Sequence, residues 1–325
     1  MPTMPSPKWR AVWTSCKETI VKSIFFTGKG GVGKSTLAAT AAYQLAERGH
    51  KVLAVSFDPA HNLGDIFGLT LSHKKQKFGK NLFLQETDLD KAAAEYIEKN
   101  IDILNQIYSY TKAFNLDLYF KVLKHSPGVE EYAALTAMET IFRQETDYDY
   151  IIFDTPPTGL TLRILALPNI TITWVDRLKR IRKQILEKRH TIHSLTGKYS
   201  EEGFVLAYKE SDDGVMKTLD DLWKRYLAVY KTLKGPDNRI AVVFNPDYLS
   251  FRETERIIEG LKDLQIPLAV GFNNKFTDDR AEAADEVESK IREKSRDIVI
   301  HRVPLHPPMK EGAYKNPFDV AGTFF

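Results

Sequence analysis

The sequence predicts an α/β protein in which helices cover both faces of an open, mostly parallel β-sheet. Three observations support this fold class. Short apolar runs typical of buried parallel strands recur along the chain, and the stretches between them have helical patterns. The first run passes into a glycine-rich turn and then into an alanine-rich helix. Alternation of strand and helix is typical of βαβ units, whose strands are parallel.

Each predicted element follows from a local pattern. The first strand, residues 24–27, is the apolar run Ile-Phe-Phe-Thr, and the alanine-rich helix over residues 37–45 ends at Gly49. The second strand, residues 51–56, completes a strand–helix–strand unit of the length that a parallel pair needs. Further apolar runs that predict strands lie at residues 150–153, 240–244, 268–270 and 298–300.

Two stretches depart from this alternation and have long helical patterns. One covers residues 92–142 and is broken at the Ser-Pro-Gly sequence of residues 126–128. The other covers residues 170–233 and contains two polar interruptions. Because the chain shows neither a repeat nor a linker, we expect residues 1–325 to form a single domain. In that domain the helical insertions would make a subdomain that binds a client or a partner.

The composition limits the classes of protein that the chain can represent. Its 46 Lys and Arg residues nearly balance 43 Asp and Glu residues, and the net charge of +3 excludes both a strongly basic nucleic-acid binder and an acidic disordered chain. A single cysteine, Cys16, excludes an intrachain disulfide and a metal site built on paired thiolates, and it suits a reducing cytosol. Without an apolar run of about 18 residues or an apolar leader, we expect a protein of the cytoplasm.

A phosphate-binding motif follows the first strand. Residues 28–35, Gly-Lys-Gly-Gly-Val-Gly-Lys-Ser, match the pattern G-x-x-x-x-G-K-[ST] and stand between a predicted strand and a predicted helix, as the chemistry requires. Glycines let the backbone curl so that several N–H groups point at phosphate oxygens near a helix N-terminus. We therefore expect Lys34 to contact the β- and γ-phosphates of a nucleotide and the Ser35 hydroxyl to bind Mg²⁺.

Two acidic residues come directly after predicted strands. Asp58 follows the second strand, and Asp154 follows the strand at residues 150–153. An acid in this position, beside a phosphate-binding loop, is typical of the carboxylate that orients Mg²⁺ through its bound water. The alternative for either residue is a helix N-cap. The neighbouring phosphate-binding motif favours the metal interpretation.

Five segments of the chain together resemble one known family. They are GKGGVGKS, DPAHNLGDIF, DTPPTGLTLRILALP, YLSFRETERIIEGL and PLHPP. The family is that of the ATPases that include the arsenical pump-driving ATPase and the ATPase for guided entry of tail-anchored membrane proteins. The resemblance covers most of the chain. It implies a P-loop NTPase fold and a homodimer that hydrolyses ATP with Mg²⁺.

The resemblance implies catalytic roles for individual residues. Asp58 is expected to polarise the attacking water, Asp154 to hold Mg²⁺ through water, and Lys34 to stabilise the transferred phosphoryl group. Lys29 resembles the second lysine of deviant Walker A loops, which reaches the nucleotide of the partner subunit. The alternative for Lys29 is a solvent-exposed lysine. Because the chain has one such loop, contact across subunits implies a homodimer.

Residues outside the loop are expected to complete the nucleotide site. Asp247 stands where the family usually has Glu, which contacts nucleotide across the dimer. Asn274 corresponds to the asparagine that binds the edge of adenine, although Asn273 leaves the register open by one residue, and Pro307 lies in the segment that packs against adenine. The predicted nucleotide-binding residues are Gly28, Lys29, Gly30, Gly31, Val32, Gly33, Lys34, Ser35, Thr36, Asp247, Asn274 and Pro307.

The resemblance offers two main functions. One is delivery of tail-anchored proteins to a membrane receptor, and the other is driving an efflux partner for arsenite or another anion. We favour the client carrier, because the arsenite-responsive branch binds As(III) through several thiolates and this chain has only Cys16. A positioning ATPase that switches on membrane or DNA and a nucleotide-sensing scaffold with negligible turnover are further alternatives.

The cysteine count also bears on the cofactors. The zinc-bound members of the family carry a C-x-x-C pair, and the nitrogenase iron protein needs two cluster cysteines per subunit; this chain has neither set. We therefore expect ATP and Mg²⁺ as cofactors, and neither zinc nor an iron–sulfur cluster.

The second helical insertion carries two further patterns. Apolar residues at helical spacing, here called the apolar stripe, fit either packing against the core or a groove for a client's transmembrane helix. Basic residues, here called the basic face, are either solvated or in contact with an anionic membrane or an acidic partner. Because no aromatic residues interleave with them, we expect no nucleic-acid partner. The apolar stripe is Trp174, Leu178, Ile181, Ile185, Ile192 and Leu195; the basic face is Arg177, Lys179, Arg180, Arg182, Lys183, Lys188 and Arg189.

Overall fold

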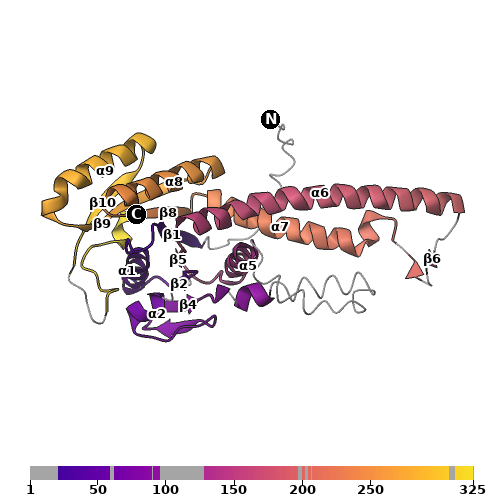
Figure 1. The fold of residues 1–325 in the computed structure, drawn as a ribbon. Coiled ribbons are helices and arrows are strands. Elements are labelled where there is room, and N and C mark those ends of the chain that lie inside the picture. The colour runs from indigo at the N-terminus through magenta and orange to yellow at the C-terminus, as the bar shows by residue number, and fades with distance from the viewer. Residues whose placement is uncertain are drawn as a thin grey trace.

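An eight-stranded β-sheet forms the centre of the fold (Figure 1). The computed structural model describes residues 21–58, 62–89, 91–95, 128–196, 200–201, 204–205, 207–306 and 312–324. The strands follow the order β10-β9-β8-β1-β5-β2-β4-β3, and each neighbouring pair is parallel except β3 with β4. The prediction of an open, mostly parallel sheet is confirmed.

The six predicted strands are all present, and two more lie at one edge. The sheet consists of β1 (Lys22–Gly28), β2 (Val52–Ser56), β3 (Gln76–Phe78), β4 (Leu82–Glu86), β5 (Tyr150–Asp154), β8 (Asn238–Phe244), β9 (Leu268–Phe276) and β10 (Val299–Pro304). A separate short pair is formed by β6 (Ser200–Glu201) and β7 (Phe204–Val205). The sequence did not indicate β3 or β4. The edge strand β3 has no buried residue, and β4 alternates buried and partly exposed residues instead of being buried throughout.

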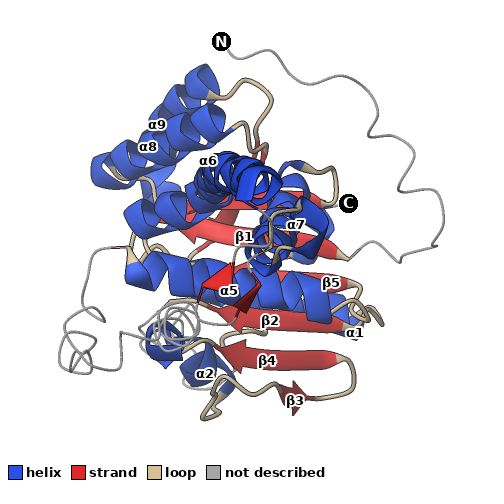
Figure 2. Ribbon diagram, turned by 90° about the vertical axis from the view of Figure 1, so that its right-hand side faces the viewer, coloured by secondary structure: helices blue, strands red, loops and turns tan. Residues whose placement is uncertain are grey.

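Helices lie on both faces of the sheet (Figures 1 and 2). In the described part of the chain, the helices with defined bounds are α1 (Lys34–Glu47), α2 (Asn62–Phe67), α5 (Val129–Gln144), α6 (Thr158–Thr196), α7 (Gly214–Lys234), α8 (Tyr248–Leu264) and α9 (Ala281–Lys294), with 3₁₀ turns η3 (Glu210–Asp212), η4 (Asp278–Arg280) and η5 (Ala321–Phe324). Residues 91–95 are also helical. Of the predicted insertion at 92–142, residues 96–127 lie outside the described part of the chain.

The core consists of two layers that share the sheet. Phe25 and Phe153 point to one face and pack with residues of α5, α6, α7, α8 and α9. Ile24 and Phe26 point to the other face and pack with residues of α1, α2 and η5. Since each fully buried Phe or Ile side chain contributes about 1.5–3 kcal/mol, this two-sided burial makes the sheet a rigid support for the loops at its carboxyl edge.

Helices α6 and α7 form an antiparallel hairpin that extends well beyond the sheet (Figure 1). Helix α6 begins close behind β5 and continues through Pro168, so the second insertion starts inside a helix and not at the expected residue 170. The Asp213 carboxylate caps α7 by accepting a hydrogen bond from the N–H of Met216 at 2.7 Å. The same carboxylate accepts two hydrogen bonds from Arg182 of α6, at 3.0 and 2.6 Å, and so ties the two helices together.

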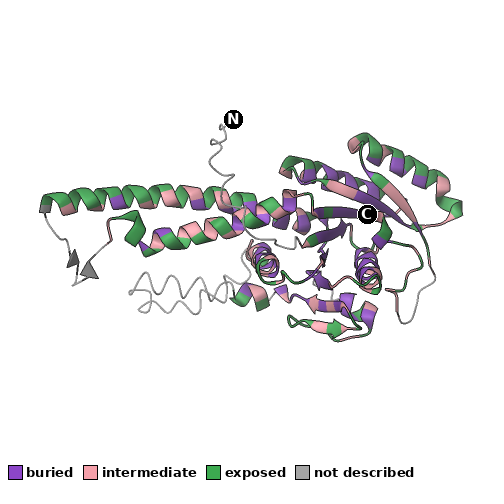
Figure 3. Cartoon of the chain, turned by 180° about the vertical axis from the view of Figure 1, so that it is seen from behind, coloured by how far each residue is buried: buried purple, intermediate pink, exposed green. Residues whose placement is uncertain are grey.

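The apolar stripe of α6 does not pack against the core. All six of its side chains are exposed, from 39% at Ile185 to 58% at Trp174 and 81% at Leu195. Figure 3 shows that much of α6 beyond the sheet is exposed. The residues of α6 that turn towards the rest of the chain are others, such as Val175 and Leu186, each 2% exposed. The interpretation of the stripe as core packing is therefore wrong for the described structure.

Three of the seven residues of the basic face of α6 pair with acids of the same chain. Besides Arg182, Lys179 pairs with Asp220 at 2.6 Å and Lys183 with Glu210 at 3.3 Å. Arg177, Arg180 and Lys188 remain exposed. The acids that these three residues contact belong to α7 and to the residues just before it. None of the helices in the described part of the chain combines the length and apolar character needed to cross a bilayer.

Candidate nucleotide-binding site

The loop at residues 28–33 connects β1 to α1, and a side chain at Gly28 or Gly33 would clash with a neighbouring strand. Gly33 is the N-cap of α1 and has a left-handed backbone with φ of 97°. A Cβ atom there would lie 2.3 Å from Nδ2 of Asn274, and one at Gly28 would lie 2.2 Å from the carbonyl oxygen of Val243 on β8. The close approach of β8 and β9 therefore requires glycine at both ends of the loop.

Lys34 and Ser35 stand in the first turn of α1 and are buried, at 4% and 9% exposure. The Lys34 ammonium donates to the carbonyl oxygen of Lys29 at 3.3 Å. Burial lowers the pKa of Lys34, while the charges of Asp154 and Asp58 act in the opposite direction. A buried cation between two carboxylates at a helix N-terminus is an arrangement suited to an anionic ligand.

Asp154 ends β5, directly beside β1 and β2. Its backbone is in register with Phe26 on one side and Ser56 on the other, and Ser56 Oγ lies 3.3 Å from its Oδ2. Burial raises the pKa of Asp154 to about 7, although a hydrogen bond with Ser35 and the charge of Lys34 lower it. Its other oxygen, Oδ1, is buried and has no hydrogen-bond partner among the described residues.

These groups fit the magnesium ion that the family implies. Mg²⁺ prefers hard oxygen ligands and is held in such sites by one or two protein groups together with phosphate and water. The Ser35 hydroxyl and the Asp154 carboxylate are such groups, and the partnerless buried Oδ1 atom gains from a nearby cation or from water that the cation orders. When bound, the ion would neutralise charge on the β- and γ-phosphates.

Asp58 lies just beyond β2 on the same edge. It is 9% exposed, and its backbone N–H donates to Ser56 Oγ at 3.2 Å. Ser56 thus contacts both predicted acidic residues, a link that the sequence analysis missed. The remainder of the DPAH sequence, residues 59–61, lies outside the described part of the chain.

The structure separates the roles of the two adjacent asparagines. Asn274 Nδ2 donates to the carbonyl oxygen of Val32 in the loop at 2.7 Å. Asn273 is fully buried and donates instead to Glu288 Oε1 of α9, also at 2.7 Å. Of the two, Asn274 is therefore the one that lies at the nucleotide loop.

The remaining residues predicted to contact nucleotide make their described interactions outside the cluster of Lys34, Asp58 and Asp154. Lys29 is half-buried, and Asp247 is exposed and caps α8 by accepting from the N–H of Ser250 at 2.8 Å. Thr36 accepts a hydrogen bond from Thr40 Oγ1 through its backbone carbonyl. Pro307 lies outside the described residues, and the segment before it is attached to the sheet by a hydrogen bond from the N–H of Leu305 to the carbonyl oxygen of Phe276.

Lys275 is a loop contact that the sequence analysis did not identify. Its ammonium donates to the carbonyl oxygen of Gly31 at 2.8 Å, and its backbone has a left-handed φ of 56°. The only sequence signal is an Asn-Lys pair near the end of an apolar run, which by itself has no distinctive pattern.

The assembled site is a glycine loop at the start of a helix, with a buried lysine and two acids at the carboxyl ends of adjacent parallel strands. A family model described as an anion-transporting ATPase matches residues 21–311. The chain belongs to this family. It is an ATP-hydrolysing enzyme, as the names of its relatives also indicate.

The relatives bear two kinds of name. A putative arsenical pump-driving ATPase 2 of Aquifex aeolicus is 30% identical over 278 residues, which are 83% of this chain and 87% of that protein. An ATPase ASNA1 homolog of Cryptosporidium parvum is 31% identical over 290 residues, 87% of this chain and 74% of that protein. A putative arsenical pump-driving ATPase of Halobacterium salinarum is 41% identical over 152 residues, 45% of this chain and 23% of that protein.

Proposed function

We propose that this ATPase works as a Mg²⁺-dependent homodimer whose nucleotide cycle moves the α6–α7 hairpin, and that the hairpin carries the membrane anchor of a tail-anchored protein. The observation that carries the proposal is the exposed apolar stripe of α6. Between Trp174 and Leu195 the stripe extends about 32 Å at a rise of 1.5 Å per residue. A single membrane-spanning helix has an apolar length of about 30 Å, so the stripe matches such a client in chemistry and length.

A short segment of the chain connects the predicted magnesium site to the α6–α7 hairpin. Only residues 155–157 separate Asp154, at the predicted magnesium site, from the first residue of α6. Within that connection Thr161 Oγ1 of α6 donates to the carbonyl oxygen of Pro156 at 2.6 Å, and Thr155 Oγ1 donates to the carbonyl oxygen of Phe26 on β1 at 2.8 Å. Loss of the γ-phosphate would release contacts next to the base of a rigid helix, whose far end would then move most.

The proposal of a homodimer depends on Lys29, which would contact the nucleotide of the second copy. A lysine at the start of the loop, half-buried in one protomer, is suited to supply positive charge to a nucleotide on a second copy, as an arginine finger does. Light scattering with Mg²⁺ and a non-hydrolysable ATP analogue tests it. Wild type should dimerise and Lys29→Ala should remain largely monomeric; equal dimer fractions would contradict the role in trans.

Client binding is tested with a defined probe. The Asp58→Asn protein, loaded with ATP, is mixed with a fluorescent peptide that has a single apolar span of about 20 residues. We expect retention that depends on ATP and is lost in an Ile181→Asp/Ile185→Asp variant, while Val299→Asp, the same change at an apolar side chain 57% exposed on β10, retains the peptide. No retention by the parent protein, or equal retention by the stripe variant, would contradict the carrier.

A second candidate is the driving of an efflux partner, which the names of the arsenical pump relatives favour. The two functions predict different material on co-purification of the Asp58→Asn protein with ATP. Tail-anchored proteins support the carrier, and a membrane-channel subunit supports efflux.

A further inference from the structure

Two neighbouring side chains of β9 hold the nucleotide loop from outside. Asn274 donates to the carbonyl oxygen of Val32 at 2.7 Å, and Lys275 donates to the carbonyl oxygen of Gly31 at 2.8 Å. Two consecutive peptide units of the loop are therefore fixed by residues more than 240 positions away in the chain.

Fixing these carbonyl groups also fixes the N–H groups that share their peptide planes. In a trans peptide the C=O and N–H bonds point in opposite directions, and the described peptide units are all trans. The carbonyl of Gly31 is paired in this way with the N–H of Val32, and the carbonyl of Val32 with the N–H of Gly33. With both carbonyls directed at β9, both N–H groups face the other side of the loop.

A break in the regular strand lets both side chains reach the same loop. Successive residues of a strand point to opposite faces, so Asn274 and Lys275 could not both do so in a regular strand. The register between β9 and β10 shifts here, because Asn273 faces Arg302 whereas Phe276 faces Pro304. The extra residue is a β-bulge, and the left-handed backbone of Lys275 lies within it. A non-glycine residue in that conformation costs about 1 kcal/mol, a strain typical of functional positions.

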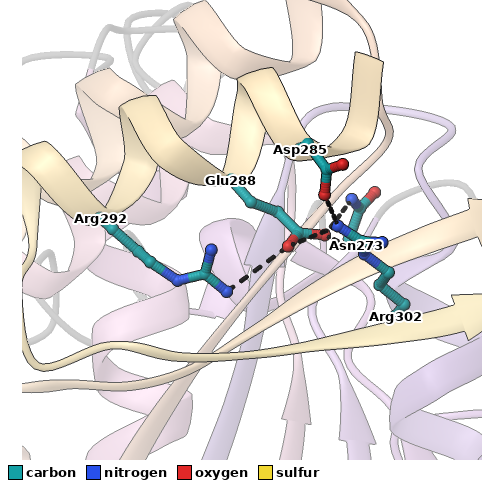
Figure 4. A network of polar contacts seen from close by, with 5 residues as sticks. All are labelled: Asn273, Asp285, Glu288, Arg292 and Arg302. Carbon is teal, nitrogen blue, oxygen red and sulfur yellow. Dashed lines mark hydrogen bonds and ion pairs between the residues drawn. The ribbon is translucent and has the colours of Figure 1, made fainter. Parts of the chain in front are cut away.

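The base of the bulge is fixed by an ion-pair network around the buried carboxylate of Glu288 (Figure 4). Glu288 of α9 is 3% exposed and accepts hydrogen bonds from Asn273 Nδ2 at 2.7 Å and from Arg302 Nε at 2.8 Å. These two donors are register partners on β9 and β10 at the start of the bulge. One carboxylate thus holds both strands where the bulge begins.

We propose that Asn274 and Lys275 are positioning residues that orient the N–H groups of Val32 and Gly33 towards the phosphates before nucleotide arrives. We call this pair the loop brace. The inference rests on the proposal that residues 28–35 bind a nucleoside triphosphate, and it adds that their affinity for phosphate depends on β9. Since the brace acts on the phosphate-binding backbone, it should strengthen the binding of any triphosphate, whatever its base.

The test compares ATP with inorganic tripolyphosphate, which has no base. Lys275→Met removes the donor but keeps the aliphatic stem and the same backbone requirement, and Lys275→Arg restores a donor. Lys80→Met, at an exposed lysine in the turn between β3 and β4, is the matched control. Dissociation constants for both ligands with Mg²⁺, together with KM and kcat for ATP and the melting temperature, are measured for each variant.

We expect Lys275→Met to weaken ATP and tripolyphosphate by the same factor, about fivefold to tenfold, since the lost bond is charge-assisted but exposed. KM should rise more than kcat falls, Lys275→Arg should recover most of the affinity, and Lys80→Met should match wild type. Unchanged tripolyphosphate affinity in folded Lys275→Met, or a loss confined to ATP, would overturn the brace while leaving the nucleotide site in place. Failure of wild type to bind ATP would overturn the nucleotide site and the brace together.

Discussion

The carboxyl edge of the sheet and helix α6 differ in which kinds of side chain they bury and expose. At the carboxyl edge of the sheet, polar and charged groups are buried, with Lys34, Asp58 and Asp154 each at 9% exposure or less. Along α6, apolar groups are exposed, with Trp174 and Leu195 at 58% and 81%. Both arrangements are costly for an isolated protomer. This comparison supports the proposed function, in which the carboxyl edge of the sheet binds Mg²⁺ and ATP and the apolar stripe binds an apolar client.

The first prediction distinguishes ATP hydrolysis from ATP binding at the nucleotide-binding site. Asp58→Asn should lower kcat for ATP hydrolysis by about 10³-fold, since it removes the group expected to orient the attacking water, and should leave ATP affinity within about threefold. Phosphate release and equilibrium titration measure the two quantities. An unchanged hydrolysis rate would show that Asp58 does not orient the water.

The second prediction concerns a substitution that should destabilise the α6–α7 hairpin and does not touch the nucleotide-binding site. Arg182→Gln removes the partner of Asp213, which is 2% exposed, and should lower the free energy of unfolding by about 3 kcal/mol. Lys183→Gln, whose pair with Glu210 is exposed, is the control and should cost less than about 0.5 kcal/mol. Denaturant unfolding measures both. Equal effects would mean that the Arg182 pair does not hold the hairpin together.

The third prediction concerns the support of β9. Glu288→Gln keeps an acceptor for Asn273 but weakens the pair with Arg302, and it should destabilise the fold by about 1–2 kcal/mol and raise KM for ATP by several-fold. Glu286→Gln, which removes an exposed pair on the same helix, is the control. A change in stability with KM unchanged would mean that the network supports α9 without affecting the nucleotide loop.

The smallest expected effect is a pH dependence at the junction of hairpin and sheet. Burial alone raises the pKa of Glu139, but hydrogen bonds from Arg225 on α7 and Arg143 on α5 bring it below its ordinary value of 4.5. The pairing therefore stabilises the fold above pH 4.5 and is lost as the pH falls through the pKa of the folded form. Glu139→Gln should be less stable than wild type at neutral pH, with a smaller loss on acidification, as thermal melts between about pH 3 and 7 would show. Parallel curves would contradict this.

The sequence predicts the placement of the candidate nucleotide site better than the surroundings of the hairpin. Residues 28–35 form a local pattern with a known mechanism, and Asp58 and Asp154 stand directly behind buried strands, so their positions along the chain place them at one edge of the sheet. The exposure of the apolar stripe could not be predicted, because helical spacing is the same whether a stripe meets a core or solvent. Lys275 could not be predicted for a related reason. Its contact with Gly31 depends on a bulge in β9, and no local sequence pattern indicates that bulge.

A calorimetric titration of the folded protein with Mg²⁺ and ATP shows whether residues 28–35 bind a nucleotide. We expect saturable binding by wild type and none by Gly33→Val, whose side chain would collide with Asn274 and whose backbone would have to keep a φ of 97°. Circular dichroism of both proteins confirms that each is folded. Absence of a binding heat from folded wild type across several temperatures, or equal binding by folded Gly33→Val, would contradict this expectation.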